Sequence, residues 1–256
     1  MKKQFTLIFG VLGLGFLVAF GIFTSEKQDL VFDGNDNSVF FDFNDDVENS
    51  ETTICGETCN GTEKNTSFVQ GVTGSAVKFE AQNESWLTVP HHSSLSFGEE
   101  GGATIAFSVK VDTHSYKHNM IYNKGDVGWG HSYNPSYDGL YEGEHLAFQA
   151  IWTGDDNQEY VNVMCNDGKE IELNKWYFVA HVLESDHKTL KQYINGIEMC
   201  SSTSKKPLNT DSLDDLNLGH VEGTYNDFSQ LALDNFTIFN YSLTADEISI
   251  LYQKLS

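Results

Sequence analysis

Residues 125–144 gather the residue types that bind sugars. Their sequence, GDVGWGHSYNPSYDGLYEGE, sets aromatic and polar side chains among glycines. Aromatic faces stack on the apolar faces of sugar rings, while Asn and Asp side chains hydrogen-bond to hydroxyl groups. The candidate ligand-binding residues are Trp129, Tyr133, Tyr137, Tyr141, Asp126 and Asn134. A long loop packed down by its own aromatic residues is the alternative interpretation.

A second candidate is a carboxylate inside a predicted strand, LALDNFTIF at residues 231–239. Strand side chains alternate between two faces, so Asp234 is predicted to share a face with Ala232, Phe236 and Ile238. A charged carboxylate among core side chains is costly unless something neutralises it or hydrogen-bonds to it. A bound cation and a set of backbone N–H groups are the two ways to satisfy it.

The charge of the chain restricts its partners. Its 256 residues carry a formal net charge of −22, with 37 acidic residues and no arginine. Nucleic acid is therefore not an expected partner, because binding it requires a basic face. An acidic surface serves solubility, and it is also compatible with Ca²⁺, which takes oxygen ligands.

The first residues predict export. Lys2 and Lys3 precede the charge-free run FTLIFGVLGLGFLVAFGIF, which is about long enough to span a membrane. Residues 1–23 are either a signal peptide or an uncleaved signal anchor. The remainder is expected to be secreted or held at the outer face of the membrane, which it touches only through this segment. Residues 24–38 are predicted to be a polar linker, and residues 39–256 a single domain.

Short alternating segments fill that domain. ATIAFSVKV places Ile105, Phe107 and Val109 on one face, and Asn-Gly and similar turn residues separate such segments. One helix is predicted at the end of the chain, where Thr244 and Glu247 have the spacing of a capping box. The predicted fold class is all-β, an antiparallel β-sandwich with a short C-terminal helix and an N-terminal apolar helix.

The cysteines and sequons suit an exported protein. The four cysteines allow three pairings, of which we favour Cys55–Cys59 and Cys165–Cys200. A zinc site would need pairs such as C-x2-C, which the chain lacks, and the two histidines after Pro90 read as a surface turn. N-x-S/T acceptors of N-glycosylation occur at Asn60, Asn65, Asn83, Asn235 and Asn240.

Several segments, in order, resemble the laminin-G-like, pentraxin-like modules of the concanavalin A-like lectin/glucanase superfamily. VFFDFNDDVEN is similar to the first strand of that family, and LNKWYFVAHVLESDHKTLKQYINGIEM is similar to its W…Y-v-NG hairpin. LALDNFTIFNYSLTADEISILY is similar to its closing strand and helix. The resemblance covers residues 39–256 and implies a jelly-roll sandwich.

The resemblance also implies a cofactor. In many relatives, a strand aspartate matched here by Asp234 helps to hold a structural Ca²⁺ together with residues of the first strand. The matched first-strand residue is Asn44, which offers a carbonyl oxygen without a charge, and Asp42 and Asp45 lie beside it. Possible structural Ca²⁺ is the one cofactor expected.

Catalysis is not expected. Relatives that hydrolyse β-glucans carry an E-x-D-x-x-E or E-x-D-x-E strand that aligns carboxylates on one face. The nearest string here, ESDHKT at residues 184–189, lacks the last Glu and sits in a predicted turn. We therefore expect an extracellular or cell-surface adhesion module that binds a glycan or a surface protein. A structural or protein-interaction module of the cell envelope and a divergent glycoside hydrolase are the alternatives.

Overall fold

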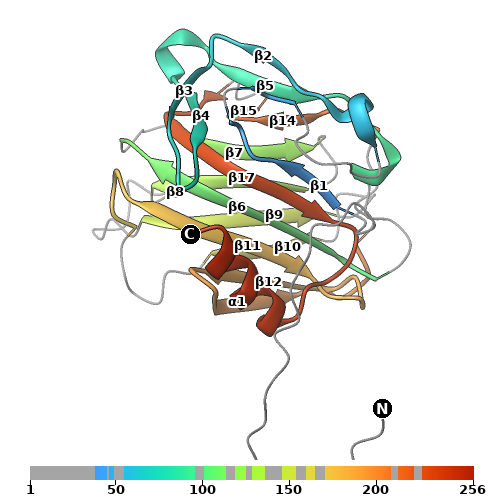
Figure 1. The fold of residues 1–256 in the computed structure, drawn as a ribbon. Helices are drawn as coiled ribbons and strands as arrows, with labels where there is room; N and C mark the ends of the chain where they lie inside the picture. Colours follow the sequence, from blue (N-terminus) through green and yellow to red (C-terminus); the bar gives the residue numbers. More distant parts are fainter. Residues whose placement is uncertain are drawn as a thin grey trace, which may run out of the picture.

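Two antiparallel β-sheets pack face to face in the computed structural model of the chain (Figure 1). The structure describes residues 38–44, 46–48, 55–95, 101–113, 119–124, 129–135, 146–153, 160–164, 171–208, 213–221 and 227–256. Short strands rich in β-branched and aromatic residues, separated by turns, form these sheets as the sequence predicts. The apolar segment at residues 1–23 and residues 24–37 of the predicted linker lie outside the described residues, whereas Ser38, the last residue of that linker, is the first residue of β1.

The eight-stranded sheet runs in the order β13-β12-β11-β6-β17-β4-β3, and β1 also pairs with β17. Its strands are β1 (Ser38–Phe41), β3 (Ser67–Gln70), β4 (Ser75–Phe79), β6 (Ala103–Val111), β11 (Trp176–Leu183), β12 (Thr189–Ile194), β13 (Ile197–Thr203) and β17 (Leu231–Phe239). β17 therefore lies at the centre of the sheet, between β6 and β4.

The seven-stranded sheet runs in the order β10-β9-β8-β7-β14-β5-β2. Its strands are β2 (Thr62–Lys64), β5 (Trp86–Val89), β7 (Asn119–Lys124), β8 (Trp129–Pro135), β9 (Leu146–Thr153), β10 (Tyr160–Met164) and β14 (Leu216–Leu218). A small separate ribbon pairs β15 (His220–Val221) with β16 (Asp227–Phe228). Three 3₁₀ turns complete the described elements: η1 (Gly56–Cys59), η2 (Ala81–Asn83) and η3 (Ser93–Leu95).

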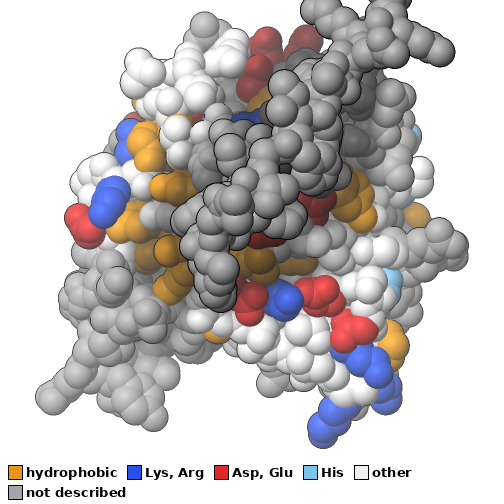
Figure 2. Space-filling model, turned by 60° about the horizontal axis from the view of Figure 1, so that its bottom comes forward, with side chains coloured by type: hydrophobic (Ala, Val, Ile, Leu, Met, Phe, Trp, Pro, Cys, Tyr) orange, Lys and Arg blue, Asp and Glu red, His pale blue; other side chains and the backbone are white. Residues whose placement is uncertain are grey.

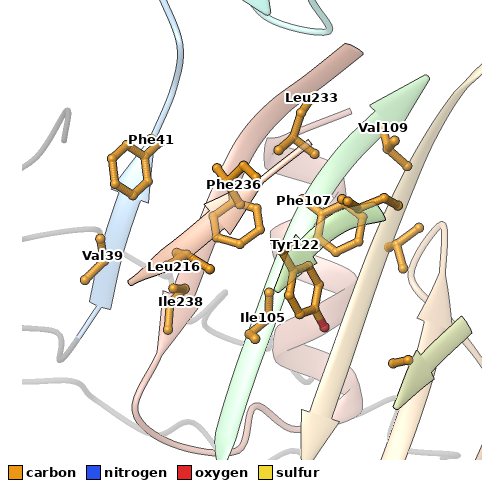
Figure 3. Close-up of a cluster of buried hydrophobic side chains, with 14 of the residues drawn as sticks. Val39, Phe41, Ile105, Phe107, Val109, Tyr122, Leu216, Leu233, Phe236 and Ile238 are labelled. Atoms are coloured by element: carbon orange, nitrogen blue, oxygen red, sulfur yellow. The ribbon is translucent and has the colours of Figure 1, made fainter. Parts of the chain in front are cut away.

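The main hydrophobic core fills the space between the sheets. Phe107 and Phe236 of the eight-stranded sheet stack with ring centroids 6.0 Å apart, and Tyr122 of the seven-stranded sheet meets both edge-on (Figure 3). The Tyr122 hydroxyl and His181 Nδ1 of β11 share a hydrogen bond of 2.9 Å. Aromatic packing thus joins the two sheets, and one buried polar contact crosses between them.

The C-terminal helix α1 (Ala245–Lys254) covers the outer face of the eight-stranded sheet (Figure 1). Its buried Ile248 and Leu251 join a second apolar cluster with strand residues such as Phe178. The predicted capping box is confirmed, because Thr244 Oγ1 accepts from the Glu247 N–H at 3.3 Å and Glu247 Oε2 accepts from the Thr244 N–H at 2.7 Å.

The predicted face of Asp234 is wrong because a β-bulge interrupts β17. Its pairing register with β6 shifts between Asp234 and Thr237, and Asn235 takes a left-handed φ of 53°. Leu233 before the bulge and Phe236 after it both belong to the core between the sheets. The extra residue reverses the alternation, so Asp234 does not share a face with Phe236 and Ile238.

Local turn chemistry agrees with the sequence. Asn195 and Gly196 have φ values of 50° and 77°, which two-residue hairpin turns of the Asn-Gly type require, and they join β12 to β13. Among the described residues, no helix combines the length and the apolar character needed to cross a membrane.

Candidate functional site

The Asp234 carboxylate contacts the turn between β3 and β4. Its Oδ2 accepts hydrogen bonds from the N–H groups of Val72 at 2.8 Å and Thr73 at 3.2 Å. Its Oδ1 is buried and has no hydrogen-bond partner among the described residues. The turn therefore satisfies one carboxylate oxygen and leaves the other for a proton or a cation.

Two glycines let this turn approach its neighbours. A Cβ on Gly71 would lie 2.5 Å from Asp234 Oδ2, so only glycine fits beside the carboxylate. Gly74 has a φ of 62°, and a Cβ there would lie 1.9 Å from Asn44 Oδ1. Asn44 Oδ1 accepts a hydrogen bond from the Ser75 N–H at 3.0 Å. Asn44 and Asp234 thus hold the turn from two sides.

The electrostatics of this cluster favour a positive partner. Burial raises the pKa of the Asp234 carboxyl to about 6, and the negative charge of Asp42 adds to the rise, against the lowering effect of the Thr73, Val72 and Asn235 N–H groups. Asp42 also accepts a hydrogen bond from the Asn44 N–H at 3.1 Å. A cation beside these groups would offset both the burial and the repulsion.

The donor set fits Ca²⁺ chemically. Calcium takes roughly six to eight oxygen ligands, and carboxylate and amide carbonyl oxygens are suitable ones. The structure brings together Asp234, Asp42 and Asn44, and Oδ1 of Asp234 is buried without a hydrogen-bond partner in the part of the chain that the structure describes. Asp45, the remaining predicted ligand, lies outside the described residues. What Ca²⁺ would supply here is charge neutralisation and a link between the first strand, the turn and β17.

A second feature is a cross-strand row of the seven-stranded sheet in which five of the seven positions carry polar side chains. Cross-strand partners share one face of a sheet. The register runs through Thr62, Thr88, Asn217, Asn123, Gly130, Ile151 and Asn162, one position from each strand from β2 to β10. At a spacing of about 4.8 Å per strand this polar row is about 29 Å long.

The polar row lies on the outer face of its sheet. Four of its members alternate along their strands with buried residues, as Thr88 does with Leu87 and Asn217 does with Leu216. The Thr88 hydroxyl donates to Asn217 Oδ1 at 2.7 Å, and the half-buried Trp86 takes the same face two positions before Thr88. Hydroxyl and amide groups beside an indole are the chemistry of a sugar site.

Sequence reasoning missed this row because it draws single residues from seven separate strands. The only local signal was an isolated polar residue between apolar ones, as in LNL and WLTV. Which residues become neighbours depends on strand order, which no local pattern shows.

The predicted ligand loop is partly replaced by a strand. Trp129, Tyr133 and Asn134 lie in β8, so the prediction of one loop over residues 125–144 is wrong. The segment pairs with β7 on one side and β9 on the other, and Trp129 is in register with the buried residues Lys124 and Trp152. The other predicted ligand residues, Asp126, Tyr137 and Tyr141, lie outside the described residues.

The disulfides follow the favoured pairing as far as the structure describes it. Cys55 and Cys59 form a disulfide across η1, with their Cα atoms 5.7 Å apart. Cys200 is also disulfide-bonded. Its predicted partner, Cys165, lies outside the described residues.

One predicted glycosylation site conflicts with the structure. Asn235 is 1% exposed, and its Nδ2 donates to Thr73 Oγ1 at 3.2 Å, so the folded domain does not present this amide to an enzyme. The bulge turns Asn235 inward, which strand alternation did not predict. Asn65 and Asn83 are exposed, whereas Asn60 and Asn240 are half-buried.

Solved structures share this fold at low sequence identity. Domain 4 of the extracellular arabinanase AbnA from Geobacillus stearothermophilus, in complex with arabinotriose, is 19% identical with a TM-score of 0.61, over 84% of this chain and 97% of that one. The binding domain of Paraclostridial Mosquitocidal Protein 1 is 18% identical with a TM-score of 0.63, over 79% of this chain and 49% of that one. The binding domain of botulinum neurotoxin serotype D is 15% identical with a TM-score of 0.60, over 86% and 52%.

This chain therefore spans about half the length of the two toxin domains. A search of curated proteins found no sequence match. The profile of one family matches residues 81–249, which is about two thirds of the chain. That match, together with the two packed antiparallel sheets and the closing helix, shows that the chain belongs to the concanavalin A-like lectin/glucanases superfamily.

Proposed function

We propose that this chain is a non-catalytic module that binds a carbohydrate through the outer face of its seven-stranded sheet. The polar row, with Trp86 beside it, is the observation that carries this proposal. The module is secreted or held at the outer face of the membrane by residues 1–23, which make its sole membrane contact. Adhesion to a glycan-bearing surface is the role that such a module serves.

The extended arrangement of the polar row across the sheet suits an extended ligand. A sugar chain presents hydroxyl groups at regular intervals, and five of the seven strands contribute a hydrogen-bonding side chain to the row. Thr88 and Asn217 already hydrogen-bond to each other, so their side chains are ordered before a ligand arrives. Ordered groups lose less conformational entropy on binding than mobile ones.

The structural neighbours suggest a first ligand to try. One of them is an arabinanase domain whose crystals contain arabinotriose, and the length of that domain is almost fully covered by this chain. Arabinan oligosaccharides are therefore the first probes, followed by an array of bacterial and plant glycans.

Binding would be measured by isothermal titration of the full chain in mild detergent with arabinotriose and with array hits. We expect Trp86→Ala and Asn217→Ala each to weaken binding by about tenfold, as the loss of a stacking or hydrogen-bonding partner implies. Ile197→Ala is the matched control, because Ile197 is exposed on β13 of the other sheet.

Unchanged binding in both variants would rule out this face. Absence of any glycan ligand would instead favour the protein-interaction module of the cell envelope, which the toxin binding domains among the neighbours also suggest.

The segment at residues 125–144 remains in the proposal. β8 places Gly130 in the polar row, and Tyr141 of the same predicted segment stays a candidate ligand-binding residue. A Tyr141→Ala variant tests whether this residue adds to the site. We expect weaker ligand binding at unchanged melting temperature, and unchanged binding would restrict the site to the row.

Structural Ca²⁺ at Asp234, Asp42 and Asn44 is the second part of the proposal. We expect saturating Ca²⁺ to raise the melting temperature of the chelator-treated protein by about 5 to 10 °C, because the ion binds only the folded state. Asp234→Ala should abolish this rise, and Asp246→Ala, which alters an exposed acid on α1, should preserve it. An equal rise in the Asp234 variant would contradict the assignment.

A further inference from the structure

Two turns far apart in the chain bring two sulfurs and an imidazole together. Cys55 and Cys59 bracket η1, and His92 precedes η3. One potential ligand atom from each of these residues lies within 4.8 Å of the others. Thiolate sulfur and imidazole nitrogen are the ligands that proteins use for Zn²⁺. Since the two cysteines form a disulfide, the cluster can bind metal only after reduction.

The positions of the cysteines do not depend on the disulfide alone. The Thr58 N–H donates to the Cys55 carbonyl at 3.2 Å, and the Thr58 hydroxyl donates to the same oxygen. Both cysteines are buried in the core between the sheets. These contacts keep η1 in place when the sulfurs separate.

The spacing of the pair suits a metal. Three residues separate Cys55 from Cys59, and their Cα atoms lie 5.7 Å apart. Structural zinc sites place roughly two to four residues between paired cysteines. A search for C-x2-C pairs overlooks this arrangement, and it also overlooks a histidine that only the fold brings close.

His92 is held in a defined orientation. The Leu95 N–H donates to the His92 carbonyl at 2.9 Å, which closes η3. Ser94 contacts His92 Nδ1 with both its hydroxyl and its N–H, the latter at 3.2 Å. For Nε2 to bind the metal, Nδ1 must carry the ring proton and donate it to the Ser94 hydroxyl, which replaces the contact with the Ser94 N–H. Metal-binding histidines commonly have such a partner on the other ring nitrogen, which orients the ring.

We propose that Cys55, Cys59 and His92 form a Zn²⁺ site that opens when the disulfide is reduced. A dithiol reductant transfers two electrons and two protons to the two sulfurs and is itself oxidised to a cyclic disulfide. Zn²⁺ then displaces both thiol protons to solvent as two Zn–S bonds form, and His92 adds a nitrogen ligand. Water fills the remaining position. The acidic surface of the chain draws cations toward the site.

The test uses Co²⁺ as a coloured substitute for Zn²⁺. The full chain in mild detergent is reduced with dithiothreitol, desalted under nitrogen and titrated with Co²⁺, with Zn²⁺ added last. We expect one equivalent of Co²⁺ to produce sulfur-to-cobalt charge-transfer absorption that Zn²⁺ removes. The oxidised protein should show none. A carboxylate site such as that at Asp234 lacks sulfur and gives no such band.

Variants separate the three ligands from other cysteines and histidines. Cys55→Ser/Cys59→Ser should abolish the band, whereas Cys200→Ser should keep it. His92→Ala should weaken Co²⁺ binding at least about tenfold, and Ser94→Ala by about tenfold. His91→Ala is the matched control with unchanged affinity.

Three results would overturn the proposal. These are a reduced wild-type protein without the band, a band that survives in the double Ser variant, and equal affinities of the His92 and His91 variants. Loss of the β-sheet circular dichroism signal on reduction would also overturn it, because the site requires both turns to stay in place.

Discussion

The Asp234 carboxylate is buried, and hydrogen bonds from the surrounding backbone offset only part of the free-energy cost of its desolvation. Two N–H groups hydrogen-bond to Oδ2, while Oδ1 has no hydrogen-bond partner among the described residues. The pKa of about 6 is the result, since burial favours the neutral acid. Without a cation, this residue should make the stability of the domain depend on pH.

The sign of that dependence follows from the raised pKa. Between the ordinary pKa of 3.8 and the folded value of about 6, the folded state holds a proton that the unfolded chain has released. The free energy of unfolding therefore falls as pH rises from about 4 to about 7, by about 3 kcal/mol from this group. Asp234→Asn removes this contribution.

Urea unfolding in the presence of a chelator measures the effect. We expect the stability of Asp234→Asn relative to the wild type to increase by about 3 kcal/mol from about pH 4 to about pH 7. Saturating Ca²⁺ should remove most of that difference at neutral pH. A difference that stays constant with pH would show that the carboxylate titrates normally.

At the scale of the elements, α1 and β17 are stabilised by different kinds of contact. α1 depends on its own N-terminal cap and on packing against the eight-stranded sheet, whereas β17 is fixed by pairing with β1, β4 and β6. The bulge in β17 is what directs Asp234 to the turn at residues 71–74 and leaves Phe236 in the core. A regular strand could not do both, because its side chains alternate strictly.

The cap of α1 can be tested by itself. Thr244→Ala removes the hydroxyl that accepts from the Glu247 N–H and should destabilise the domain by about 1 kcal/mol. The melting temperature would fall by about 2 to 4 °C. Gln253→Ala, at an exposed position in the last turn of the helix, should change it little. Equal effects of the two variants would show that the cap contributes nothing.

At the scale of the whole molecule, surface ion pairs and a buried hydrogen bond between the sheets accompany the hydrophobic core. The chain has 37 acidic side chains against 15 lysines, and ion pairs such as Lys64–Glu84 at 3.7 Å and Lys175–Glu172 at 2.6 Å use some of those lysines. Figure 2 shows acidic and basic side chains lying next to each other on the displayed face. Inside, Tyr122 and His181 join one sheet to the other.

His181 should make the domain sensitive to acid. Burial lowers its pKa from 6.5 to about 3, so the folded state keeps it neutral while the unfolded chain takes up a proton below about pH 6.5. The free energy of unfolding therefore falls as pH drops from about 6.5 toward 3, opposite to the effect of Asp234. Between about pH 7 and about pH 5 the loss is about 2 kcal/mol.

The double variant His181→Leu/Tyr122→Phe removes both partners of this hydrogen bond. Its stability relative to the wild type should improve by about 2 kcal/mol when the pH is lowered from about 7 to about 5, as measured by urea unfolding. Asp234 is present in both proteins, so its contribution cancels. A constant difference would mean that His181 is accessible to protons in the folded state.

Some features of this protein follow from neighbouring residues alone. The alternation of residues 103–111, the Asn195-Gly196 turn, the Thr244–Glu247 cap and the short Cys55–Cys59 loop each involve positions a few residues apart. Backbone geometry and side-chain reach decide such features, so the sequence determines them whatever the rest of the chain does.

Other features arise only when distant strands pair. The bulge that buries Asn235, the strand that replaces a loop at Trp129, the polar row and the approach of His92 to Cys55 and Cys59 all depend on which segments become neighbours. Their energies come from contacts between residues far apart in the chain. Sheet order and register decide those contacts, and no local pattern of residues contains that information.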